Sequence, residues 1–549
     1  MKKIIYLLLA ASALLLYYFW HWSLPTSTPI ALKPAGTEKN LVLLPLDSRP
    51  VCSTMVQKLG RLAGLDVILP PKAFLDNYQE PADKEKLLIW LQNELKITPQ
   101  AIISTDILLH GGLLHTRQHK ANELEQHKLL YALQNLPASD IDLFSVIPRL
   151  LVSDQIYPDT WYWFHLLRYS TLTDQALIFN DPYITEQLEE ITAQIPPDII
   201  EKYRLLYQSN ADFNTKLLQL TNARRRILIG QDDSHPFGLP HRNALKAEQQ
   251  MEKSPSPYDV LSYGADELSA LLLARTYLRQ SGYQPKIYLR YSNPATEFLY
   301  MPYMSASTGA ALRNQIQLLG VKKATDEATA DIIFYVNCGS SSFSPGQRQA
   351  QELNELLATG KHIGLIDLSA NFEESELLMP QLLKYSVPIN KLSAYAGWNT
   401  FSNSSGTALA QGIIFAGRCQ QLKKAGNIEA LPALYGQNLS FICERLLDDY
   451  VYQKKLHPEL GPWLGSFGYT STNLDKEEGL PIAESKVQVY LALQALKLLH
   501  QNLGQTAFYE DGHNSYFLKD ITVGSRLPWG RIFEVDLQVW TEFGVVKKK

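Results

Sequence analysis

The chain has 549 residues but only four cysteines, which lie far apart at Cys52, Cys338, Cys419 and Cys443. No two of them form a C-x-x-C pair, so the sequence contains neither a zinc knuckle nor a dithiol redox motif. Their spacing does not select any disulfide pair. The motifs H-E-x-x-H, G-x-S-x-G, G-x-x-x-x-G-K and G-x-G-x-x-G are also absent. The zinc-protease, serine-hydrolase and nucleotide-binding classes therefore lose their usual support, and we expect no cofactor and no resident metal.

An excess of positive charge is lacking as well. The 51 lysines and arginines nearly balance 55 aspartates and glutamates, and the formal net charge is -4. The one basic run is the short tail Lys547–Lys549, so a nucleic-acid partner is not expected. With 46% hydrophobic and 19% charged residues, the chain has the composition of a large folded protein and not of a disordered one.

The beginning of the chain carries an export signal. Lys2 and Lys3 precede an apolar run from Ile4 to Trp20, which as a helix would reach about 25 Å, close to the hydrocarbon thickness of about 30 Å. We interpret residues 1–22 as an uncleaved membrane anchor, with a cleaved signal peptide as the alternative. The Pro/Ser/Thr-rich residues 23–39 are expected to form a tether. Both interpretations place the rest of the chain in the periplasm or outside the cell.

From residue 40 the sequence alternates short aliphatic runs with segments of helical periodicity, which is typical of an α/β fold with a parallel-sheet core. Ten strands are predicted, at Leu41–Leu46, Asp66–Leu69, Ala101–Thr105, Ile141–Ile147, Ile227–Gly230, Asp259–Tyr263, Lys286–Tyr291, Asp331–Val336, His362–Asp367 and Leu392–Ala396. Because polar residues follow nearly every strand, we favour a (β/α)-barrel-like arrangement over a doubly wound, two-lobe one. Ten strands are more than the eight that close a barrel.

The predicted organisation has three parts. Residues 40–300 form the main α/β domain, with a helical insertion at about 157–223, and residues 301–412 form a second α/β part. Residues 413–549 form a helical C-terminal region that ends in a short β-like segment at Ile532–Val539.

The strongest candidates for catalysis are two acidic pairs that follow consecutive predicted strands. Asp232 and Asp233 follow the fifth strand, and Asp266 and Glu267 follow the sixth. We expect the two pairs to lie about 5–10 Å apart, a separation suited to the acid and the nucleophile or base of glycoside hydrolysis. Neighbouring carboxyls resist ionising together, so one can keep its proton and donate it. The alternative is that Asp233 and Glu267 cap the helices that follow.

Candidate substrate-binding residues follow other strands. Asp47 and Arg49 form a tight turn after the first strand, and Arg149 follows the fourth. They could orient a substrate carboxylate, sulfate or phosphate, or Asp47 and Arg49 could form an internal salt bridge.

The third predicted strand is followed by Asp106 and by the glycine pair Gly111 and Gly112, which would let the backbone approach a ligand closely. His110 and His115 in the same segment are isolated histidines, so no metal site is predicted there.

The densest polar and aromatic stretch of the chain spans residues 394–406 and has the composition of a binding loop. Tyr395 and Trp398 would offer flat apolar faces, and Asn399 and Asn403 can each donate and accept hydrogen bonds. A sugar, with apolar ring faces and many hydroxyls, suits this mixture. The alternative is a packed loop whose asparagines cap a helix.

Six motifs stand together in this chain: Pro45-Leu46-Asp47-Ser48-Arg49-Pro50-Val51, Ser104-Thr105-Asp106 with Gly111-Gly112-Leu113, Gly230-Gln231-Asp232-Asp233, Gly264-Ala265-Asp266-Glu267, Tyr395-Ala396-Gly397-Trp398-Asn399-Thr400, and Leu527-Pro528-Trp529 through Glu534. In combination they resemble a bacterial family of proteins of unknown function, DUF4127. The sequence departs from the family pattern at Ser48, where an acidic residue is expected, and at His110, where tyrosine is expected. The resemblance implies one continuous domain with shared motifs and carries no reaction with it.

These observations predict an exported, membrane-tethered hydrolase of a glycan or cell-envelope saccharide. Asp232, Asp233, Asp266 and Glu267 would supply the acid, base or nucleophile. One alternative is a non-catalytic envelope protein that binds a saccharide or peptidoglycan fragment in the same pocket. Another is a metal-dependent hydrolase that uses Asp47, Asp106 and Asp232.

Overall fold

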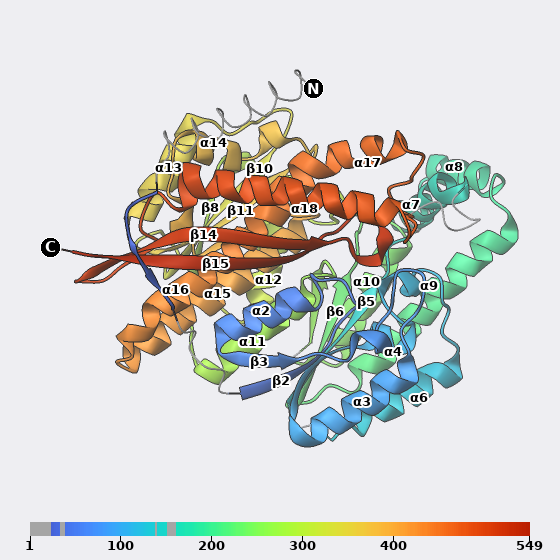
Figure 1. Ribbon diagram of the computed structural model, residues 1–549. Helices are drawn as coiled ribbons and strands as arrows, with labels where there is room; N and C mark the ends of the chain where they lie inside the picture. The colour runs from blue at the N-terminus through green and yellow to red at the C-terminus, as the bar shows by residue number, and fades with distance from the viewer. Residues whose placement is uncertain (1–23, 33–38, 138–139, 151–160, 258, 549) are drawn as a thin grey trace.

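The computed structural model describes residues 24–32, 39–137, 140–150, 161–257 and 259–548 (Figure 1). The apolar run predicted to be a membrane anchor lies outside these residues. Within the described ranges, no helix is both long enough and apolar enough to span a bilayer.

The first sheet contains six parallel strands in the order β3-β2-β4-β5-β6-β7. Its strands are β2 (Lys39–Leu44), β3 (Leu65–Ile68), β4 (Gln100–Ser104), β5 (Asp140–Ile147), β6 (Arg225–Gln231) and β7 (Val260–Tyr263). The central strands are buried along most of their length and are largely apolar, as expected for a parallel sheet that is covered by helices on each side.

The second sheet contains five parallel strands in the order β12-β11-β10-β8-β9. Its strands are β8 (Lys286–Tyr291), β9 (Lys322–Lys323), β10 (Ile332–Gly339), β11 (His362–Ser369) and β12 (Ala394–Ala396). Counted within each sheet, the strand order begins 2-1-3-4-5 in both, the order of flavodoxin-like doubly wound sheets.

Helices connect the strands of both sheets. Those of the first sheet are α2 (Thr54–Ala63), α3 (Lys84–Ile97), α4 (Thr105–Leu109), α5 (Leu113–Thr116), α6 (Glu123–Gln134), α7 (Trp163–Phe179), α8 (Pro182–Thr192), α9 (Pro197–Leu218), α10 (Leu239–Lys253) and α11 (Leu268–Ser281). Those of the second are α12 (Thr308–Leu319), α13 (Gln347–Ala358), α14 (Met379–Lys384) and α15 (Phe401–Lys424). Helices α7 to α9 form the helical insertion between β5 and β6.

One hydrophobic core joins the two sheets. It contains Leu43 and Phe144 of the first sheet, Phe334 of the second, and the buried faces of α2, α11 and α15. Helix α15 is buried along most of its length, and its glycines allow close packing: a Cβ on Gly412 would lie 2.8 Å from Cζ of Phe334. The two sheets and α15 therefore form one continuous interior.

The C-terminal region is helical, with an antiparallel sheet packed on it. The helices are α16 (Leu431–Arg445), the π-helix η7 (Leu446–Leu456), α17 (His457–Gly465), α18 (Gly479–Leu498) and the π-helix η8 (Leu499–Leu503). A long hairpin of β14 (Asn514–Arg526) and β15 (Asp536–Lys547), red in Figure 1, is extended by β13 (Tyr509–Glu510) and β1 (Thr28–Ile30). Strand β1 lies within the segment expected to be a tether.

An α/β fold with parallel-sheet cores and a helical C-terminal region is confirmed, and each of the ten predicted strands exists. Strands β1, β9, β13 and β14 were not predicted. The second half of the expected β-like segment Ile532–Val539 forms the start of β15, and the first half lies in the loop before it. All four cysteines are buried thiols without a disulfide.

Candidate functional site

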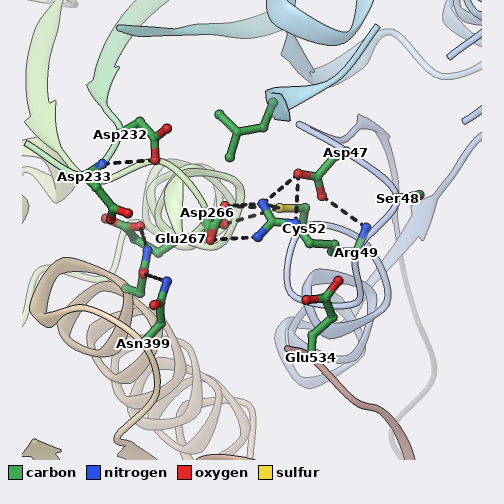
Figure 2. Close-up of polar contacts among 12 residues, drawn as sticks. Asp47, Ser48, Arg49, Cys52, Asp232, Asp233, Asp266, Glu267, Asn399 and Glu534 are labelled. Carbon is green, nitrogen blue, oxygen red and sulfur yellow. Dashed lines mark hydrogen bonds and ion pairs between the residues drawn. The ribbon is translucent and has the colours of Figure 1, made fainter. Parts of the chain in front are cut away.

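The site lies beyond the carboxyl ends of the first sheet. The six strands are parallel, so the residues that follow them lie at the same end of the sheet. Asp47 follows β2, Asp106 lies in the first turn of α4 after β4, and the two acidic pairs follow β6 and β7. Segments that are far apart in the sequence therefore meet at the carboxyl ends of the strands (Figure 2).

Arg49 holds two carboxylates together. Its Nη2 donates to Asp47 Oδ2 and to Asp266 Oδ1, both at 2.6 Å, and all three side chains are buried. Burial raises the pKa of Asp266, and the charge of Arg49 opposes that effect. The alternative of an internal salt bridge between Asp47 and Arg49 therefore describes the observed contact, and the bridge extends to the β7 end of the sheet.

Asp232 and Asp233 are adjacent in sequence but differ in electrostatic environment. Burial would raise the pKa of Asp232, yet the nearby charges of Arg117 and Arg149 outweigh it and lower that pKa. Arg117 Nη2 donates to Asp232 Oδ2 at 2.6 Å. Burial raises the pKa of Asp233, the charge of Asp232 adds to the increase, and an ion pair with Arg149 opposes it. The pair thus contains one carboxyl whose pKa is lowered and one whose pKa is raised.

Glu267 is fully buried beside this pair. Burial raises its pKa to about 8, and the charges of Asp266 and Asp233 add to the rise. Asn403 Nδ2 donates to its Oε2 at 2.7 Å, whereas Oε1 is buried without a hydrogen-bond partner. The space around the Glu267 side chain, which we call its slot, is tight, because a Cβ on Gly406 would lie 2.4 Å from Glu267 Cγ. Glu267 precedes α11 but makes no capping hydrogen bond there, so the capping alternative does not describe its side chain.

The loop between β12 and α15 contributes amides. Asn403 is the third residue of a capping box at the start of α15, and its Oδ1 accepts from Thr400 Oγ1 at 2.7 Å and from Asn399 Nδ2 at 2.8 Å. Its Nδ2 is committed to Glu267. Asn403 therefore takes part in capping a helix, as the alternative interpretation held for the asparagines, and it also positions an acidic side chain of the site, whereas Asn399 donates to Asn403.

A cavity of about 270 Å³, which we call the strand-end cavity, opens onto these groups. Its polar lining comprises Arg49, Arg117, Arg149, Gln231, Asp232, Asp233, Asp266, Asn399, Thr400, Ser402, Asn403 and Arg531, and its aromatic lining comprises Tyr303 and Phe533. The volume is just below the range of about 300–1,000 Å³ typical of small-molecule pockets.

A second cavity of about 280 Å³ adjoins the first and shares Arg49, Asn399 and Phe533 with it. We call it the π-helix cavity because η7 lines it. Trp398 lines this second cavity and does not line the first.

Apart from Trp398, which lines the π-helix cavity, the predicted site residues fall into two groups. Asp232, Asp233, Asp266, Arg49, Arg149, Asn399 and Asn403 line the strand-end cavity. Asp47, Asp106, Gly111, Gly112, Glu267 and Tyr395 line neither of the two cavities.

The second group has internal contacts instead. Asp106 Oδ2 accepts from the backbone N–H of Val146 at 2.9 Å, and burial raises its pKa to about 8. A Cβ on Gly112 would lie 2.9 Å from Asp76 Oδ2, so this glycine makes room for a protein side chain. Tyr395 is 1% exposed.

Several site residues were not predicted. Arg117, Tyr303, Arg531 and Phe533 line the strand-end cavity. Buried Asp76 accepts from the backbone N–H of Ser48 at 2.7 Å. Arg117 follows the glycine pair and Arg531 follows the Leu-Pro-Trp motif, so both were close to recognised signals, whereas nothing in the sequence marks Asp76 or Tyr303.

Backbone strain is concentrated at the two cavities. Seven non-glycine residues of the described chain have positive φ, and Tyr303, Phe372 and Asn399 among them line a cavity. Such conformations cost about 1–3 kcal/mol each and persist where the surroundings enforce them, often at functional sites.

The fold and these cavities define an α/β protein with a charged, polar crevice at the carboxyl ends of a parallel sheet. The chain belongs to the family described as protein of unknown function, DUF4127, whose model matches residues 41–538. The resemblance inferred from the six motifs is thereby confirmed. No curated protein and no solved structure matches the chain.

Proposed function

We propose that this protein is a hydrolase that acts on a saccharide in the strand-end cavity by carboxylate acid/base chemistry. The observation that carries the proposal is the convergence of Asp232, Asp233 and Asp266, from two neighbouring strand ends, on one cavity. The lining also contains amides, hydroxyls and two aromatic rings, a mixture that suits a sugar.

In this proposal Asp233 donates a proton to the glycosidic oxygen. Its raised pKa and its position at the cavity support that role, since a general acid must be protonated near the working pH. Asp232 stays ionised and faces the positive charge that develops at the anomeric carbon, or accepts a proton from the attacking water. The bond broken is the one between the anomeric carbon and the leaving oxygen, and water supplies the hydroxyl.

The remaining groups of the cluster position substrate or hold charge. Arg49 and Arg149 orient Asp266 and Asp233, and Asn399 offers a hydrogen bond to sugar hydroxyls. Glu267 lies behind the lining and supports the cluster from its buried slot.

The test is the isosteric change Asp233→Asn, assayed on cell-envelope glycans and aryl glycosides. We expect a loss of turnover of about 10²–10⁴-fold, the usual contribution of a general acid. Asp66→Asn on β3, an exposed carboxylate, is the matched control and should keep wild-type activity. Wild-type turnover by a folded Asp233→Asn protein would rule out the assignment.

A second candidate is a saccharide-binding protein without turnover. It is supported by the ion pairs Arg117–Asp232, Arg149–Asp233 and Arg49–Asp266, because a carboxylate held in an ion pair is a poor proton donor. Calorimetry separates the two candidates: binding with no product, unaffected by Asp233→Asn, would favour this second function.

A metal-dependent hydrolase through Asp47, Asp106 and Asp232 has less support. Among the described residues, the three potential ligands that lie within one metal's reach are Asp47, Cys52 and Asp266, and the Arg49 guanidinium already bridges the two carboxylates.

We also propose a finer description of fold and location. Two open, doubly wound lobes are favoured over the barrel, since each sheet has two edge strands, β3 and β7 in one and β12 and β9 in the other. The proposed location is the outer side of the cytoplasmic membrane, anchored by residues 1–22, or secreted if that segment is cleaved. The support is the apolar run that follows Lys2 and Lys3.

A further inference from the structure

The π-helix cavity lies next to the strand-end cavity, and the two share three lining residues. A substrate unit in the first cavity would therefore have a neighbouring space of similar size for the unit attached to it. Trp398, Phe372 and Phe533 give this second space three aromatic faces.

The segment that lines it is unusual. Residues Leu446–Leu456 form eleven residues of π-helix, a conformation that is rare, usually a single turn, and frequent at functional sites. Asp448, Gln453 and Lys454 of this segment line the cavity, as does His457 just after it.

Lys454 and Arg445 both line the π-helix cavity, but they differ in their ion-pair partners. Arg445 pairs with Asp448 and Asp449, with 2.9 Å between nitrogen and oxygen in each case. Lys454 is only 9% exposed, yet no carboxylate of the described chain lies within 4.0 Å of its Nζ. Its observed partner is the ring of Phe372, 5.3 Å from Nζ to the centroid.

The two carboxylates that could neutralise Lys454, those of Asp449 and Asp367, already accept hydrogen bonds from other groups. Asp449 accepts from the backbone N–H of Gly397 and from Arg445. Asp367 accepts from Asn337 Nδ2 and from the backbone N–H groups of Leu378 and Met379. A buried ammonium without an ion-pair partner is costly, and a ligand anion would supply the partner.

We propose that the π-helix cavity is an adjoining subsite for a sugar unit that bears a carboxylate, and that Lys454 binds this carboxylate. Among the described lysines and arginines that line this cavity, Lys454 is the one without a carboxylate within 4.0 Å, and four acidic residues, Glu444, Asp448, Glu534 and Asp536, also line it. This balance suits a single negative charge better than a phosphate dianion. The inference rests on the proposed saccharide site and specifies its substrate class as an acidic oligosaccharide.

The experiment compares two disaccharides by calorimetry on the full chain. N,N′-Diacetylchitobiose is neutral, and N-acetylglucosaminyl-N-acetylmuramic acid differs from it by a lactyl ether that carries one carboxylate. We expect the wild-type protein to bind the acidic disaccharide about tenfold more tightly, as a charge-assisted hydrogen bond would give. Lys454→Met should remove this preference and leave the affinity for N,N′-diacetylchitobiose unchanged.

Two controls accompany the variant. Lys384→Met changes a lysine that also lies 5.3 Å above a ring, that of Tyr385, but on the surface, so it should behave as wild type. The methyl ester of the acidic disaccharide removes the charge without changing the protein, so the wild-type preference should disappear with it even if Lys454→Met does not fold.

The outcomes separate this inference from the proposed function. Equal wild-type affinities for the two disaccharides, or a preference that survives in Lys454→Met or in the ester, would overturn the acidic subsite and leave the saccharide site standing. Failure of the wild-type protein to bind either disaccharide would overturn both.

Discussion

At the scale of single residues, most charged side chains at the two cavities form ion pairs, whereas Glu267 and Lys454 do not. Asp232, Asp233 and Asp266 each have an arginine partner, whereas Glu267 has an amide, and in the neighbouring cavity Lys454 has no carboxylate. Burial without a counter-charge favours the neutral form of an acid. Burial therefore favours the protonated form of Glu267.

Glu267→Gln should change how stability depends on pH. The pKa of Glu267 is raised from an ordinary 4.5 to about 8, so the folded state holds a proton that the unfolded state releases. Stability contributed by this residue is complete below about pH 4.5 and is lost as the pH rises towards 8. Relative to wild type, the variant should gain up to about 1.4 kcal/mol in unfolding free energy per pH unit within this window.

Urea unfolding of both proteins at pH 5, 6, 7 and 8 measures this difference. Glu429→Gln, at an exposed position, is the control and should follow the wild-type curve. A constant offset between Glu267→Gln and wild type across the four pH values would contradict the proposed protonation.

At the scale of elements, α15 connects the two sheets and closes the site. Its first turn carries the capping box that holds Asn403, and its second turn presents Gly406 to Glu267. The helix could approach so closely only because glycine stands where a side chain would overlap the acid. The same residues thus serve packing and the geometry of the cluster.

Gly406→Ala should destabilise the protein by about 1–3 kcal/mol, since the new methyl group would lie 2.4 Å from Glu267 Cγ in a closely packed interior. Gly465→Ala at the end of α17 is the matched control: no atom beyond its chain neighbours lies within 4 Å of the new Cβ, and helix propensity should leave the variant neutral or slightly more stable. Thermal unfolding of both variants checks this, and equal midpoints would count against the tight slot.

At the scale of the whole molecule, the C-terminal hairpin completes a site that is otherwise built from the two parallel-sheet regions and the start of α15. The loop between β14 and β15 brings Arg531 and Phe533 to the strand-end cavity. Trp529 in that loop donates from Nε1 to Ser48 Oγ at 2.8 Å and stacks on Tyr78, with ring centroids 5.9 Å apart. The two ends of the chain are therefore energetically linked at the site.

Trp529→Phe keeps the stacking but removes the hydrogen bond to Ser48, so we expect a loss of about 0.5–1.5 kcal/mol of stability. Trp540→Phe on β15, at a position 55% exposed, should change stability by less than about 0.5 kcal/mol. Chemical denaturation measures both, and an effect of Trp540→Phe as large as that of Trp529→Phe would argue against a specific contact between the hairpin and the first sheet.

The sequence by itself determined the elements whose signal is local. The aliphatic runs of β2, β5 and β10 are recognisable because a buried parallel strand is apolar on both faces, and the acidic pairs are recognisable because they follow such runs directly. It did not predict β1 or β14: β1 is short and Pro/Thr-containing, and β14 and β15 are stabilised by pairing with one another across a long loop.

The tertiary structure alone decided which of the candidate residues share a cavity. Asp106, Tyr395, Asp232 and Asn399 all lie at or near the ends of predicted strands. Asp106 and Tyr395 are nevertheless buried, whereas Asp232 and Asn399 line the strand-end cavity. Asp76, Tyr303 and Lys454 acquire their significance from neighbours that lie tens of positions away along the chain. Burial and charge pairing depend on distances in space, and such distances are set by the packing of α15 and the hairpin rather than by any pattern along the chain.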